Sequence, residues 1–214
     1  MMPMLKLAAY SAWARRLTLG VTLFAVALST ATLLSVERIR VDARQSFTQS
    51  VTGVDLIVGA RTGGVQLMLY SVFHVGQATN NIDWKSYEAM RSHPAVAWAI
   101  PLSLGDSHRG FAVLGTTPEY FSRFLYGDGN NLKFRSGQSF ENVFEAVIGS
   151  EVATPLKYQI GDSMTLSHGA GNQGLSEHGD KPFKVVGILA PTGTPVDRTV
   201  HIRLEAMTAL HLDW

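Results

Sequence analysis

The clearest hydrophobic pattern in the sequence is an uncharged stretch near its N-terminus. From Leu17 to Val36 the chain runs for 20 residues without a charged side chain. Because an α-helix rises about 1.5 Å per residue, such a helix covers the ~30 Å hydrocarbon core of a bilayer. The pattern therefore predicts a transmembrane helix over residues 17–36.

The residues before this stretch predict its orientation. They include the cations and aromatic rings that are typical of a membrane interface: Lys6, Tyr10, Trp13, Arg15 and Arg16. Since cytoplasmic flanks of a span carry an excess of Lys and Arg, we expect a cytoplasmic or interfacial segment over residues 1–16. The N-terminus is then in the cytoplasm, and the rest of the chain is outside.

A cleavable signal peptide is the alternative interpretation of the same stretch. Ala25-Val26-Ala27 has the small residues of a cleavage site. Cleavage there would leave Leu28–Val36 as an apolar new terminus, so a permanent span is the favoured interpretation.

Small and hydroxylated residues recur along the span at intervals of four, three, four and three. They are Thr18, Thr22, Ala25, Ser29 and Thr32. This spacing places them on one helical stripe, where small side chains allow close approach of neighbouring helices and hydroxyl groups bond across the contact. The alternative is a solitary anchor whose hydroxyl groups bond back to their own helix.

After the span, the pattern changes to a helical stalk and then to short strands and helices. The stretch from Glu37 to Phe47 contains no Gly or Pro, which predicts a stalk helix over residues 37–52. Val54–Val58 is typical of a buried strand. A helix is expected from Asp83, its N-cap, with Trp84, Tyr87 and Met90 buried. Such alternation indicates an α+β class.

Further elements follow from the same periodicity. Two strands are expected to flank a polar turn over 105–110. Later strands are expected at Glu145–Ile148, Lys184–Leu189 and Val200–Leu204. A Gly-rich loop near residue 127 suggests two lobes, the first formed by residues 53–126 and 191–214 and the second by residues 127–190.

Composition excludes several functions. The net charge is +1 and no block of like charges occurs, so no nucleic-acid partner is indicated. The chain has no cysteine, which excludes disulfides and thiolate zinc sites. Gly59–Gly64 faintly resembles a phosphate-binding loop but lacks the Lys-Ser/Thr pair, so we expect no cofactor on this chain.

Hydrophobic residues punctuated by glycines recur in the second half of the chain, in Glu145–Ser150, Ala153, Leu156, Gly161-Asp162, Thr165-Leu166 and Phe183–Leu189. Together with the first span and the Val54–Val58 segment, they resemble the periplasmic core of MacB/FtsX-type ABC-transporter permeases. The resemblance implies a transmembrane helix with a stalk, followed by a two-lobed mixed α+β periplasmic domain.

The resemblance also implies a function and a set of partners. A permease of this type has four spans, with the outer domain between the first and second, so we expect this chain to be part of a larger permease. It works as a homodimer or heterodimer in the bacterial inner membrane, in contact with membrane lipid. An ABC ATPase subunit that binds ATP drives it, and a periplasmic protein is a further partner. Efflux, lipoprotein release or envelope transport would be its role, without catalysis on this chain.

The alternative function is a singly anchored periplasmic binding or sensing module linked to zinc. His168, Glu177, His178 and Asp180 lie in one Gly-rich loop, and His108 is the best outside ligand. Their spacing matches no established zinc motif, so solvated loop residues are the favoured interpretation.

Three further features have both a structural and a functional interpretation. Asp197 and Arg198 follow Thr192-Gly-Thr-Pro, which is either a rigid turn or a partner contact. Ser107 with Asp106, His108 and Arg109 suggests a hydrolase, although adjacent turn residues point apart. The apolar run Val65–Val75 is core by default and otherwise a surface for a partner or lipid.

The stripe yields a testable prediction. Replacing Thr22, Ala25 and Ser29 together by Leu should impair assembly with companion spans, because bulky side chains prevent close helix packing. Assembly is measured by co-purification and by transport, and unchanged values in both would contradict the packed-helix interpretation.

Overall fold

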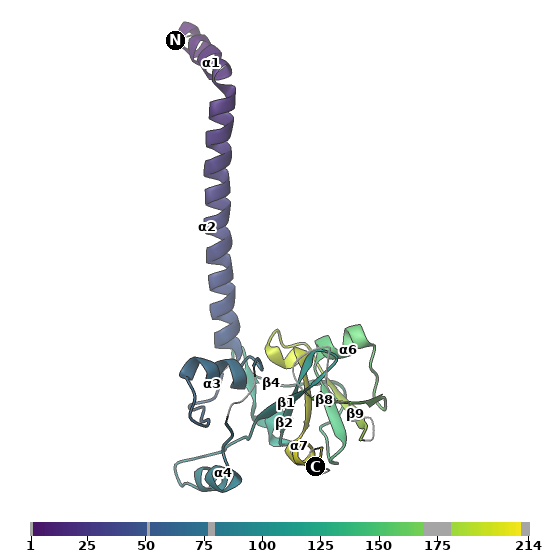
Figure 1. Cartoon of the computed structure of the whole chain (residues 1–214). Coiled ribbons are helices and arrows are strands. Elements are labelled where there is room, and N and C mark those ends of the chain that lie inside the picture. The colour runs from purple at the N-terminus through teal and green to yellow at the C-terminus, as the bar shows by residue number, and fades with distance from the viewer. Residues whose placement is uncertain (1, 51, 77–79, 169–180, 211–214) are drawn as a thin grey trace. The chain divides into compact units, whose positions relative to one another are not determined.

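The computed structural model describes residues 2–50, 52–76, 80–168 and 181–210 (Figure 1). The chain divides into two compact units, Met1–Gln45 and Ser46–Trp214, which we describe separately.

The first unit is helical. It contains α1 (Met2–Ala14) and most of α2 (Arg16–Ser50), which has 35 residues. Among the described residues, one helical stretch, Arg16–Asp42, is long and apolar enough to cross a bilayer, judged by its length and composition. The helix continues without interruption to Ser50, so one element includes the predicted span and nearly all of the predicted stalk.

The second unit is built on a mixed β-sheet. Its strands are β1 (Ser103–His108), β2 (Phe111–Thr116), β5 (Phe134–Gly137), β6 (Glu145–Ile148), β7 (Ser163–Met164), β8 (Ser167–His168), β9 (Phe183–Leu189) and β10 (Thr199–Arg203). The order is β5-β9-β6-β10-β2-β1-β8, with β7 also on β9. The β10–β2 and β6–β9 pairs are parallel and the others antiparallel. A separate small pair joins β3 (Leu125–Tyr126) to β4 (Asn130–Asn131).

Short helices accompany these strands. They are α3 (Gly64–Ser71), α4 (Trp84–Arg91), α5 (Glu119–Arg123), α6 (Ser150–Leu156), η1 (Pro195–Arg198) and α7 (Leu204–Ala209). The predicted mixed α+β class, with an N-terminal apolar helix before a sheet-rich domain, is confirmed.

The sheet has a core on each face. In β6, Ala146 and Ile148 belong to one hydrophobic cluster and Val147 belongs to the other. The first cluster includes residues of α6 and α7, and the second includes Tyr120 and Phe121 of α5. Because both faces are covered, the central strands are nearly continuous in apolar residues and do not alternate with polar ones.

The later strands lie close to their predicted positions. β6 has the predicted bounds, and β9 and β10 begin one residue earlier than expected. The expected division into two lobes is not visible in strand pairing, because β6 and β9 share a sheet with β2 and β10 across the described residues. The lobe boundaries remain a prediction.

The structure corrects the predicted turn over residues 105–110. Residues up to His108 belong to β1, and the turn is limited to Arg109 and Gly110, both with positive φ. Polar composition misled the prediction there, since Asp106, Ser107 and His108 are all buried.

The first part of the unit is less buried than its sequence predicts. Asp83 caps α4 as expected, its carboxylate accepting a 2.7 Å hydrogen bond from the Ser86 backbone N–H. However, α4 has no buried residue, and Trp84 is 54% exposed. Val54–Val58 carries no assigned strand, which corrects the prediction of a buried strand there.

Two buried histidines lie at β10, His201 within the strand and His74 against its first residue. The His74 Nδ1–H donates to Thr199 Oγ1 at 2.8 Å, since that hydroxyl group donates its own proton to the Pro195 carbonyl. His201 lies against the rings of Tyr120 and Phe121. Burial lowers the pKa of His74 to about 4. Burial and, to a smaller extent, the nearby His74 lower the pKa of His201 to about 3.

These shifts predict a pH-dependent stability. Below pH ~6.5 the unfolded chain binds protons that the folded chain excludes, so the free energy of unfolding should fall as the pH drops towards 4. Each histidine contributes about 1.4 kcal/mol per pH unit in that window. His201→Phe should reduce the slope by this amount in denaturation of the full chain, whereas the same change at exposed His93 should not. Equal slopes for wild type and His201→Phe would contradict the assignment.

Candidate functional site

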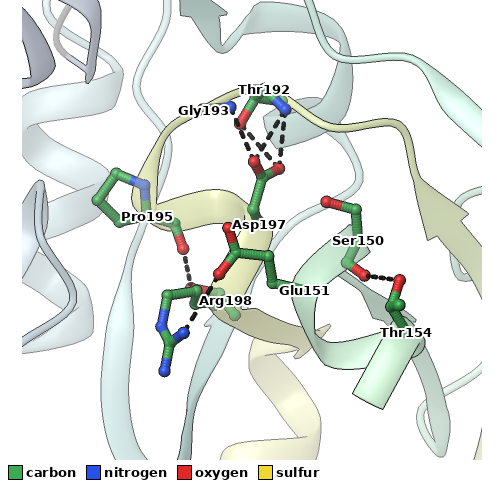
Figure 2. Close-up of polar contacts among 9 residues, drawn as sticks. Ser150, Glu151, Thr154, Thr192, Gly193, Pro195, Asp197 and Arg198 are labelled. Atoms are coloured by element: carbon green, nitrogen blue, oxygen red, sulfur yellow. Dashed lines mark hydrogen bonds and ion pairs between the residues drawn. The ribbon is translucent and has the colours of Figure 1, made fainter. Parts of the chain in front are cut away.

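The loop before β10 is organised around one buried carboxylate (Figure 2). Asp197 is 4% exposed, and its oxygens accept hydrogen bonds from the backbone N–H groups of Thr192 and Gly193 at 2.8 to 3.0 Å. The Thr192 hydroxyl group adds a third donor at 3.0 Å. A charged acceptor with several backbone donors holds a loop in one conformation. Asp197 therefore has a clear structural role.

The neighbouring Arg198 faces solvent. Its guanidinium forms an exposed ion pair with Glu151 of α6 at 3.2 Å, as Figure 2 shows, and lies over the Phe111 ring at 5.4 Å from the ring centroid. Surface ion pairs of this kind contribute little to stability. Of the two residues predicted for partner contact, Arg198 is thus the one that a partner could reach, and the contact itself remains a prediction.

Close backbone packing joins this loop to β6 and α6. A Cβ atom on Gly149 would lie 2.3 Å from the backbone oxygens of Val196 and Asp197, so only glycine fits at this position. The Gly149 N–H also donates to the Thr199 carbonyl at 3.0 Å. The rigid loop therefore fixes the start of α6 against the start of β10.

The predicted helix-packing stripe lies on α2. Thr18, Thr22, Ala25, Ser29 and Thr32 are all exposed within the first unit. The hydroxyl groups of Thr22 and Thr32 donate to the carbonyls of Thr18 and Leu28, four residues earlier. These bonds satisfy the hydroxyl groups in a lone helix, and the methyl and methylene surface stays available to a neighbour. Packing through the stripe remains a prediction.

The weak metal candidates are dispersed or undescribed. His178, Asp180 and Glu177 lie outside the described residues, and His168 is placed in β8 by its backbone alone. His108 uses both ring nitrogens: Nδ1–H donates to the Thr165 carbonyl at 2.6 Å, and Nε2 accepts from the Tyr158 hydroxyl group at 2.9 Å. No cluster of three candidate ligands occurs in the described part of the chain.

The two hydrogen bonds of the His108 ring also test the interpretation of Ser107 as a hydrolase nucleophile. With both nitrogens of His108 engaged by Thr165 and Tyr158, neither is directed to the hydroxyl group of Ser107. A nucleophile needs a base at hydrogen-bond distance, and His108 does not supply one in this arrangement.

Sequence reasoning missed a groove in the second unit. A groove with a cavity volume of about 1010 Å³ is lined by Val54–Ala60, residues of α3 and α4, His93 and Ala95–Ser103. Its walls include Tyr70, Trp84, Tyr87 and Trp98. The apolar run Val65–Val75 was the available signal, but its default assignment to the core is wrong for most of α3, which has no buried residue. Only folding shows which apolar residues are left uncovered.

The described chain is thus a sheet-rich domain preceded by a helix that is long and apolar enough to cross a membrane. The chain belongs to the family of MacB-like periplasmic core domains, whose model matches residues 17–212. No curated protein matches the chain.

The solved structures that match the chain have low sequence identity to it. The periplasmic region of MacB from Actinobacillus actinomycetemcomitans is 12% identical, with a TM-score of 0.43, 70% of this chain covered and 64% of that one. The extracellular domain of the noncanonic ABC-type transporter YknZ from Gram-positive bacteria is 14% identical, with a TM-score of 0.40 and coverages of 60% and 65%.

A domain of a putative permease from Porphyromonas gingivalis is 11% identical, with a TM-score of 0.39 and coverages of 56% and 55%. This chain thus spans less than two thirds of each of these three structures.

The loop geometry predicts unequal effects for its two charged residues. Asp197→Ala should lower the free energy of unfolding by about 3 kcal/mol, because three donors lose a charged acceptor inside the fold. Arg198→Ala should change it by less than about 1 kcal/mol. Chemical denaturation of the full chain in mild detergent measures both. Equal effects, or a neutral Asp197→Ala, would show that Asp197 does not organise the loop.

Proposed function

We propose that this protein is the permease subunit of a MacB/FtsX-type ABC transporter in the bacterial inner membrane. Its N-terminus is cytoplasmic, its main domain is periplasmic, and an ABC ATPase subunit supplies ATP hydrolysis. The observation that carries the proposal is the family match, which includes the apolar helix and the folded domain in one continuous range, residues 17–212.

Helix α2 provides a physical route for coupling. It is uninterrupted from Arg16 to Ser50, so every backbone hydrogen bond between span and stalk belongs to one helix. A continuous helix resists bending and passes a displacement of the span along its axis. We propose that ATP hydrolysis inside moves the span in this way, within a homodimer or heterodimer of permeases.

The proposal assigns this chain no catalysis and no cofactor of its own. It is supported by the engagement of His108 with Thr165 and Tyr158, which separates it functionally from Ser107. The alternative, a singly anchored sensing module, is not favoured, because one family match runs from the apolar helix into the sheet-rich domain, over residues 17–212.

The experiment uses the complete gene product in inverted and right-side-out membrane vesicles. An ABC ATPase should co-purify with it, and added protease should reach the main domain only from the periplasmic side. Limited proteolysis of that domain should change when ATP and vanadate are added, since hydrolysis would alter the domain's conformation.

A break in α2 tests the coupling step. Val41→Pro should abolish the ATP-dependent change in proteolysis while the ATPase still co-purifies, because proline removes a helical hydrogen bond and kinks the helix. Val41→Ala is the matched control and should behave like wild type. The proposal fails if no ATPase co-purifies, and rigid coupling through α2 fails if Val41→Pro responds to ATP normally.

A further inference from the structure

The segment Val54–Val58 has the composition of a strand but pairs with no strand in the part of the chain that the structure describes. Its Val, Leu and Ile residues favour β-structure. An isolated bridge joins Thr52 to Leu125 just before it, yet no strand is assigned to Val54–Val58 within the described chain. Leu56 is 75% exposed and Val58 48% exposed. The preference of this segment for β-structure therefore disagrees with its exposed environment. Such a disagreement is expected where a contact is still to be made.

The groove lies directly beside this segment. All five residues of Val54–Val58 line it, together with aromatic side chains that include Trp84, Tyr87 and Trp98. The groove has the size and mostly apolar lining of a recognition site. A strand placed along Val54–Val58 would direct every second side chain into the groove.

The charge of the groove restricts its partner. Asp55 is the only carboxylate among the described lining residues, and neither Lys nor Arg is present there. Its His93 is exposed at the surface. The groove therefore disfavours an acidic partner and complements one that is neutral apart from a cation near Asp55.

We propose that Val54–Val58 is a docking strand for an extended segment of a periplasmic partner protein. The partner segment has apolar residues at alternating positions and a Lys or Arg that meets Asp55. Its backbone pairs with Val54–Val58, and its apolar side chains enter the groove. The partner's compartment rests on the proposed function, whereas the pairing rests on the segment and the groove alone.

The backbone distinguishes this mode from the alternatives. A helix satisfies its own N–H and C=O groups, so a helical partner would leave Val54–Val58 unpaired, and an apolar small molecule would do the same. A strand supplies donors and acceptors along the whole segment, from which strand addition gains its affinity, while the groove selects the side chains.

The test uses a defined peptide, acetyl-Lys-Val-Lys-Leu-Lys-Val-Lys-amide, and the full chain in mild detergent. Trp84 and Trp98 report binding through their fluorescence, in a background that carries Trp13→Phe and Trp214→Phe. The peptide should bind, and a version N-methylated on alternate backbone nitrogens should bind at least ten-fold more weakly. Asp55→Asn should weaken binding and reduce its dependence on salt.

Matched variants locate the site. Leu56→Asp should weaken binding at least ten-fold, and Ile160→Asp, the same change at another exposed aliphatic residue, should leave it unchanged. Circular dichroism checks that both variants remain folded. Equal binding of the N-methylated peptide, or its displacement by phospholipid, would overturn the docking strand. The docking strand would also be overturned if Leu56→Asp lowered the oligomeric mass of the chain without peptide, because the groove would then bind a second copy of the chain. None of these outcomes affects ATPase co-purification.

Discussion

Apolar side chains project from both faces of the central strands, and the need to cover both faces places most other elements of the second unit. Val113 and Leu114 of β2 are neighbours in sequence but lie in different clusters. Burial of each large apolar side chain stabilises the fold by about 1.5–3 kcal/mol, so neither face can be left to water. Helices α6 and α7 cover one face, and α5 with Val196 of η1 contributes to the other.

This double covering explains the buried polar groups. His201 alternates with Val200 and Ile202 in β10, so its ring enters the cluster that contains Tyr120 and stays neutral there. Asp197 is buried because the loop before β10 must turn tightly beside Gly149, and its carboxylate supplies the acceptors that the turning backbone needs. Both side chains are thus buried because of how the fold packs, and their polar groups have a structural role.

The region between Thr52 and Ser103 differs from the rest of the unit. Its helices α3 and α4 contain no buried residue, and its apolar side chains line a groove. Surfaces that exchange partners are drawn from the less buried parts of a fold. The proposed docking strand and the proposed coupling through α2 use different parts of the chain, one a weakly buried segment and the other a continuous helix.

The sequence by itself determined the long apolar helix, the α+β class, and the strands β6, β9 and β10, because length, charge and local periodicity decide these features. It also determined the Asp83 cap, which depends on residues three apart. The environment of Val54–Val58, the burial of Asp106 to His108 and the close approach of Gly149 to the loop around Asp197 were decided only by tertiary structure. In each case the deciding neighbour is remote in sequence, as Thr165 is from His108, and a local pattern carries no information about which surfaces such neighbours cover.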